Sequence, residues 1–244
     1  MLTAVIISAI AASFCNMLIY RLNTGLSLLR PAHSICPVCR ERLHWYELVP
    51  VFSFLIQRGR CRSCGAKIPP RYLLLELSFI GTAIILSWQY PQGFWPQLIL
   101  FWFIWAIFFS DLEYQEIPYL FSLGFGLLLV LKGLNGSLVN LLIWGGLFLF
   151  IKALEYFHYK RPVFGGADLL LFFLAALYFR PPAYILLLYL AFFSGLLISL
   201  LLLALRRAKR DSLIPFTPFI LLAFVLTEYW SAVFLRWAGY WYGA

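Results

Sequence analysis

Long apolar runs alternate with short polar connectors along the whole chain. An α-helix needs about 20 apolar residues to cross the hydrocarbon core of a bilayer, and most of these runs approach that length. The pattern therefore predicts an all-α polytopic membrane protein with about eight transmembrane helices. The expected helices cover residues 1–20, 72–90, 94–110, 118–131, 138–156, 168–179, 183–205 and 214–235.

The first run is expected to stay in the protein, because it lacks the basic start and the small-residue cleavage site of a signal peptide. Residues 21–71, which follow it, form the only long polar segment. We therefore predict three domains: a first transmembrane helix at 1–20, a polar domain at 21–71 and a membrane domain at 72–244. A chain that is 63% hydrophobic and 12% charged cannot be an ordinary soluble domain.

The net charge of +9 orients the helices and does not by itself indicate nucleic acid. All but three of the 19 Lys and Arg fall in loops and flanks on one side of the predicted membrane, and only Lys132, Arg180 and Arg236 fall on the other. Basic residues concentrate on the cytoplasmic side of membrane proteins. The sequence thus predicts a cytoplasmic 21–71 domain, both termini outside and an anionic lipid bilayer as partner, without nucleic acid.

Four of the five cysteines form two C-x-x-C pairs inside the polar domain. The pairs are Cys36 with Cys39 and Cys61 with Cys64. Two such pairs bring four thiolates into a tetrahedron, which is the geometry of a closed structural Zn²⁺ site. Four sulfurs saturate zinc, so we expect neither His33 nor His44 to be a ligand and the metal to stabilise the domain rather than to catalyse. The alternative is four free or redox-active thiols. Cys15, in the first apolar run, is expected to fill apolar space.

One carboxylate lies at the mouth of an unusually short apolar run. Asp168 follows Gly165-Gly166-Ala167, and Arg180 ends the run that starts at residue 169. A run this short places Asp168 inside the level of the membrane, where ionisable groups are costly and usually functional. The glycines indicate non-helical backbone there, which is tolerated only beside protein or a water-filled cavity. The alternative is a short helix that Asp168 caps at a thinned interface.

A second carboxylate, Asp111, follows the 94–110 run on the same predicted side of the membrane as Asp168. Two carboxylates that face each other can share a proton and activate water for attack on an amide, one as base and the other as proton donor. Asp111 and Asp168 are therefore the catalytic candidates. Glu113 and Glu116 are expected to be solvated acids at a helix end, and the alternative for Asp111 is that it is a third such acid.

Several stretches together resemble one known family along nearly the whole chain. They are Ser13-Phe14-Cys15-Asn16 through Tyr20-Arg21-Leu22, Leu48-Val49-Pro50, Arg58-Gly59-Arg60-Cys61, Pro70-Arg71-Tyr72 and Ile214-Pro215-Phe216-Thr217-Pro218-Phe219. The chain thereby resembles the type IV prepilin peptidases, also called GxGD-type aspartyl membrane proteases. The resemblance implies that Asp111 and Asp168 are the two catalytic aspartates and that residues 36–64 form the tetracysteine zinc loop.

The resemblance implies cleavage of the short basic leader of type IV prepilins or pseudopilins, at the cytoplasmic face of the bacterial inner membrane. Many members of the family then methylate the new N-terminus with S-adenosylmethionine. Methylation is expected here by analogy alone, because residues 21–71 contain no recognisable methyl-donor motif.

Three positions depart from the family pattern. Ala167 stands at the second glycine before the aspartate, Leu170 at a common lysine and Tyr119 at a common acid. These departures keep open the alternative of a degenerate, zinc-stabilised membrane scaffold that binds pilin-like helices without cleaving them. A small-molecule transporter is disfavoured, because the chain shows no internal repeat and its two aspartates lie towards one face.

Overall fold

The computed structural model describes residues 2–89, 93–160, 165–206 and 214–237, and within these residues the chain is helical. Its only β-type pairing there is two isolated bridges, Ile35 with Arg42 and Arg60 with Lys67. The helices are α1 (Leu2–Asn23), α2 (Phe52–Ile56), α3 (Arg71–Gln89), α4 (Phe94–Tyr114), α5 (Tyr119–Lys132), α6 (Leu138–Leu154), α7 (Gly166–Tyr178), α8 (Pro181–Ala204) and α9 (Thr217–Trp237). A 3₁₀ turn covers Trp45–Leu48, and a π turn, Glu155–Tyr159, continues α6.

Five of the described helices are long and apolar enough to cross a membrane: α1, α3, α4, α6 with its π turn, and α8. Three further apolar helices are shorter, namely α5, α7 and the Thr217–Trp230 part of α9. Together they match the eight predicted segments, so the prediction of an all-α polytopic fold with a small tetracysteine domain between the first two long helices is confirmed. The connector at 90–92 and most of the basic loop at 206–210 lie outside the described residues.

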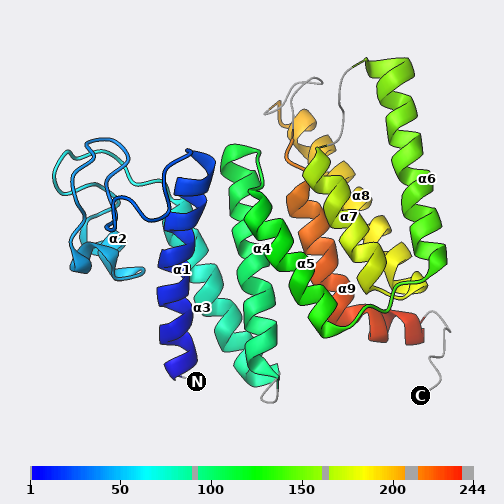
Figure 1. Ribbon diagram of the computed structural model, residues 1–244, viewed down its shortest axis with the longest axis horizontal. Helices are drawn as coiled ribbons and strands as arrows, with labels where there is room; N and C mark the ends of the chain where they lie inside the picture. Colours follow the sequence, from blue (N-terminus) through cyan, green and yellow to red (C-terminus); the bar gives the residue numbers. More distant parts are fainter. Residues whose placement is uncertain (1, 90–92, 161–164, 207–213, 238–244) are drawn as a thin grey trace. The chain divides into compact units, whose positions relative to one another are not determined.

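The chain divides into two compact units, Met1–Phe121 and Ser122–Ala244. In the first unit α1, α3 and α4 pack against one another (Figure 1). The packed face of α1 carries small residues at helical spacing, Ala4, Ser8, Ala12 and Cys15, all of which are buried. Cys15 therefore fills apolar space, as the sequence predicts.

The second unit contains α6 to α9 and most of α5, and its core is aromatic. Phe172 of α7 stacks on Phe192 of α8, and Phe216 packs on both rings. Gly195 of α8 faces Phe216 so closely that an added Cβ would lie 2.7 Å from its ring. The close approach of α8 to the start of α9 therefore depends on this glycine.

The short helix α7 ends against the loop between α5 and α6. The last carbonyls of any helix lack partners within that helix and need donors when they are away from water. Here the loop and α6 supply donors: Asn135 N–H to the Tyr178 carbonyl (3.2 Å), Gly136 N–H to Leu177 (2.8 Å), and the Asn140 side chain to Ala176 (3.0 Å) and Phe179 (2.7 Å). A helix of 13 residues can thus end inside an apolar protein without unpaired carbonyls.

Candidate functional site

The four paired cysteines converge into one cluster. Their sulfur atoms all lie within 4.8 Å of one another, and the Sγ atoms of Cys36 and Cys64 are 4.0 Å apart. Zn–S bonds of about 2.3 Å in a tetrahedron require sulfurs about 3.8 Å apart, so the cluster fits zinc with little adjustment. Within the described residues this converging group consists of the four cysteines alone.

The two halves of the cluster have the same backbone design. In the first, Cys36 N–H donates to the Glu41 carbonyl (2.9 Å) and Arg40 N–H to the Cys36 carbonyl (2.9 Å). In the second, Cys61 N–H donates to Ala66 (2.8 Å) and Gly65 N–H to Cys61 (2.9 Å). Arg40 and Gly65, at equivalent positions, both have positive φ. Each C-x-x-C pair thus lies on a tight, internally bonded turn that presents two sulfurs to the other turn.

The electrostatic surroundings of Cys61 favour its thiolate, which is the form that binds metal. The backbone N–H groups of Cys64 and Ser63 lower the pKa of the Cys61 thiol to about 7, against the opposing effect of burial. More of this side chain is therefore deprotonated near neutral pH than in a free cysteine. Cys36 and Cys61 are buried, whereas Cys39 and Cys64 are exposed, so the cluster lies at the edge of the polar domain.

Buried charged side chains attach the polar domain to the first unit's helices. Arg21, in the last turn of α1, donates to four carbonyls of the following loop, those of Ser27, Leu28, Pro31 and His33, at 2.7–3.0 Å. Glu76 of α3 accepts a hydrogen bond from Val51 N–H at 2.7 Å. Sequence reasoning gave neither residue a role, although a charge next to an apolar run is a signal for such a contact.

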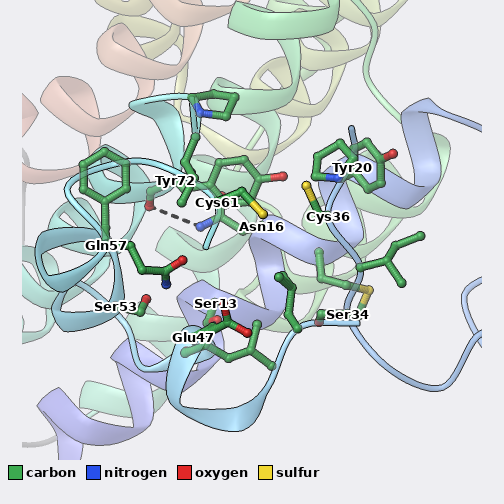
Figure 2. A pocket seen from close by; sticks show the side chains of 18 of the residues that line it. Ser13, Asn16, Tyr20, Ser34, Cys36, Glu47, Ser53, Gln57, Cys61 and Tyr72 are labelled. Atoms are coloured by element: carbon green, nitrogen blue, oxygen red, sulfur yellow. Dashed lines mark hydrogen bonds between the residues drawn. The ribbon is translucent and has the colours of Figure 1, made fainter. Parts of the chain in front are cut away.

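A cavity of about 140 Å³ lies between the cysteine turns and the facing ends of α1 and α3 (Figure 2). This volume could hold on the order of ten water molecules. Its wall combines apolar groups with Glu47, Glu76, Tyr20 and Tyr72. Asn16, which is 2% exposed, donates to the Tyr72 carbonyl at 3.2 Å, while its Oδ1 has no hydrogen-bond partner. The cavity therefore offers hydrogen-bond acceptors and aromatic faces to a ligand.

Asp111 is buried in the last turn of α4. Its neighbour Ser110 accepts a hydrogen bond from the Asn23 side chain (2.9 Å) and donates to the Glu116 carbonyl (2.7 Å), which fixes the end of α4 against α1. Glu113 pairs with the buried guanidinium of Arg71 on α3. Glu113 is thus an ion-pair partner within the first unit and not only the solvated acid that the sequence suggests.

Asp168 is buried in the first turn of α7. Its Oδ1 accepts a 2.6 Å hydrogen bond from the hydroxyl of Thr217, the first residue of α9. On the other side, a Cβ added to Gly165 would lie 3.3 Å from Oδ2. Trp144 of α6 donates to the carbonyl of Leu169, the residue after Asp168, at 3.2 Å. A hydrogen bond from the start of α9 therefore holds the carboxylate, and a hydrogen bond from α6 holds the backbone next to it.

The structure brings the four predicted metal ligands together and describes each predicted catalytic aspartate inside its own unit, Asp111 in the first and Asp168 in the second. Thr217 is the residue near a predicted catalytic group that sequence reasoning did not identify. The sequence around Thr217 contains no local signal for this contact, because the contact depends on how α7 and α9 meet.

Comparison with known proteins adds to this geometry. Residues 6–90 match the family model described as the bacterial peptidase A24 N-terminal domain. The chain is 28% identical over 229 residues to a prepilin leader peptidase/N-methyltransferase of Legionella pneumophila, an alignment covering 88% of this chain and 78% of that protein. A Stutzerimonas stutzeri protein of the same name is 26% identical over 265 residues, which cover 94% of this chain and 90% of that protein. A Vibrio cholerae protein of that name is 32% identical over 127 residues, which cover 48% of this chain and 50% of that protein.

No solved structure matches the chain.

Proposed function

We propose that the chain is a membrane aspartyl endopeptidase for type IV prepilins or pseudopilins. The proposal starts from the resemblance to prepilin leader peptidases, which these comparisons confirm. The observation that carries the proposal is the likeness to a prepilin leader peptidase/N-methyltransferase over 88% of the chain. Asp168, which the family resemblance makes the second catalytic aspartate, is buried and accepts a hydrogen bond. In this proposal Asp111 and Asp168 form the catalytic pair. The substrate would be the short basic leader, cut at the cytoplasmic face of a bacterial inner membrane.

The chemistry needs only these two carboxyl groups and water. One carboxylate takes a proton from the water molecule while the water oxygen attacks the amide carbonyl carbon. The partner carboxyl group, which carries the shared proton, protonates the carbonyl oxygen. Collapse of the tetrahedral intermediate breaks the C–N bond, and a proton from the pair passes to the departing amine. The titration of such a pair belongs to both groups together.

Zinc would be held by Cys36, Cys39, Cys61 and Cys64 and would have a structural role. Four sulfur ligands leave no position open for a substrate or water. The ion would instead fix the two cysteine turns to each other. It would thereby stabilise the 21–71 domain, which lies in the chain between the first transmembrane helix and the 72–244 peptidase domain. We propose that this zinc domain lies in the cytoplasm.

Methylation of the new N-terminus is a second proposed activity, and the cavity beside the cysteine turns supports it. A methyl donor of the S-adenosylmethionine type carries a sulfonium cation. Cations of this kind bind to aromatic faces and to hydrogen-bond acceptors, and the residues that line the cavity include Tyr20, Tyr72, Glu76 and Asn16. These residues would hold the donor in the first unit.

One experiment tests both activities. The full chain, purified in lipid nanodiscs, is incubated with a prepilin, and mass spectrometry follows the substrate. We expect the leader to be removed by the wild type but not by Asp111→Asn or Asp168→Asn, each at unchanged thermal stability. With S-adenosylmethionine present, the mature product should gain the mass of one methyl group.

Retained cleavage in either Asp→Asn variant would show that the catalytic pair is wrong. Wild-type protein that binds several prepilins and cleaves none would instead support the scaffold alternative. A cleaved but unmethylated product would contradict the second activity alone.

A further inference from the structure

The hydroxyl of Thr217 and the carboxylate of Asp168 form a buried pair at the junction of two helices. Thr217 is 1% exposed and Asp168 is 9% exposed. The two residues are 49 positions apart in the chain, and their oxygens are 2.6 Å apart. Hydroxyl donors to carboxylate oxygens lie at about 2.5–2.7 Å, so the geometry is that of a strong, charge-assisted hydrogen bond.

The position of Thr217 in α9 shows that this bond is not part of ordinary helix capping. A capping hydroxyl belongs to the residue before the first helical turn and accepts from N–H groups of its own helix. Thr217 is already the first residue of α9, and its hydroxyl donates across to α7. Both ends of the bond are shielded from water, so loss of the donor would leave one Asp168 oxygen without this partner.

The other carboxylate oxygen has different surroundings. Oδ2 lies beside Gly165, which has no side chain to cover it. Oδ1 is thus engaged by Thr217, Oδ2 faces Gly165, and the backbone of Gly165 also hydrogen-bonds the carboxylate. Both α7 and α9 also begin at this point, and helix N-termini favour a carboxylate.

We propose that Thr217 is a positioning residue of the peptidase site: its hydroxyl holds Asp168 through Oδ1 and so directs Oδ2 to the reacting water. The role rests on the proposed function, because it concerns the aspartate assigned to catalysis there. It adds a third residue, from a helix that contributes neither aspartate, to the machinery. It also gives the two oxygens of Asp168 separate tasks.

The test separates the hydroxyl from the rest of the side chain. Thr217→Val keeps the branched shape and removes the donor, whereas Thr217→Ser keeps the donor and removes a methyl group. Thr227→Val is the matched control, because Thr227 is a fully buried threonine on the same helix whose hydroxyl has no hydrogen-bond partner among the residues that the structure describes. Each full-length protein is assayed in nanodiscs for kcat and KM on a prepilin and for its thermal midpoint.

We expect Thr217→Val to lower kcat about 10- to 100-fold, as for loss of a hydrogen bond to a charged group, with KM changed less than about twofold. Thr217→Ser should restore most of the wild-type kcat, and Thr227→Val should match the wild type. Unchanged kcat in Thr217→Val, or an equal loss in Thr217→Ser, would overturn the role while leaving the peptidase intact. Wild-type protein that cleaves no prepilin would contradict the proposed function and this role with it.

A double-mutant cycle tests the hydrogen bond without relying on activity. Thr217→Val should lower the thermal midpoint in the wild-type background by more than it does in Asp168→Ala, where no acceptor remains. Equal shifts in the two backgrounds would show that the two side chains are not coupled, and would overturn the proposal.

Discussion

Gly165 shows how a single missing side chain shapes the surroundings of Asp168. Its φ of −64° is accessible to any residue, so backbone freedom does not explain a glycine here. The reason is space, because a Cβ would lie 3.3 Å from Asp168 Oδ2. The adjacent Gly166 differs, since a Cβ there would meet no atom of the described residues within 4 Å. The two neighbouring glycines therefore have separable roles.

We predict that Gly165→Ala impairs cleavage and that Gly166→Ala does not. The added methyl group should turn the carboxylate away from its position and lower kcat about tenfold or more, as misplacement of a reacting group does, with little change in thermal midpoint. Gly166→Ala should keep the wild-type rate and gain up to about 1 kcal/mol of stability from reduced chain entropy. Both rates come from the prepilin assay. Equal effects of the two substitutions would show that contact with Oδ2 is not the cause.

At the level of single residues, the sequence predicts groups whose chemistry is unusual for their surroundings. Asp168 stands out as an acid before an apolar run, and the four cysteines stand out by their repeated spacing. Thr217 does not, because a threonine is unremarkable until the fold brings it 2.6 Å from a carboxylate 49 positions away. Contacts of this kind depend on how two helices meet, and no local pattern encodes them.

Elements are predicted best where hydrophobicity alone determines them. All eight apolar runs begin within a few residues of the observed helices, and α7 is as short as its sequence implies. The ends of helices are harder to predict from hydrophobicity. Helix α4 continues past Asp111 and ends at Tyr114, where Gln115 adopts a left-handed conformation and its N–H caps the Asp111 carbonyl. The cysteine spacing predicts the turns of the zinc domain, whereas the Arg21 contacts depend on tertiary structure.

The two cysteine turns are the elements that we expect to depend on metal. Each is closed by only three backbone hydrogen bonds, which include those of its isolated bridge, so little besides the ion would join one turn to the other. We predict one zinc ion per chain, and faster hydrogen exchange in residues 34–68 after chelation, with α3 and α4 unchanged. Elemental analysis and exchange mass spectrometry measure the two effects.

Cys39→Ser should lose zinc, whereas Cys15→Ser, a change inside α1 away from the cluster, should retain it. Zinc-free protein with all four cysteines intact and the wild-type exchange pattern would contradict the metal site.

For the whole molecule, the order of helices decides whether the two aspartates can meet. Asp111 lies in the last turn of α4 and Asp168 in the first turn of α7, with α5 and α6 between them. Two crossings return the chain to the side from which it started. If α5 crosses fully despite its 14 residues, we expect both aspartates at the same face, which we propose to be the cytoplasmic one because basic residues concentrate there.

We therefore predict alternating accessibility along this part of the chain. The test uses single cysteine substitutions at the exposed residues Glu116, Asn135 and Lys160. They report the accessibility of the α4–α5 loop, the α5–α6 loop and the end of α6, respectively. In intact cells a membrane-impermeant maleimide should label Asn135→Cys only, and in inverted membrane vesicles it should label Glu116→Cys and Lys160→Cys above the level of the parent protein's own cysteines. Labelling of Glu116→Cys and Asn135→Cys from the same side would mean that α5 does not cross. Asp111, at the end of α4, and Asp168, at the start of α7, would then lie at opposite faces of the membrane. They could not act as one catalytic pair.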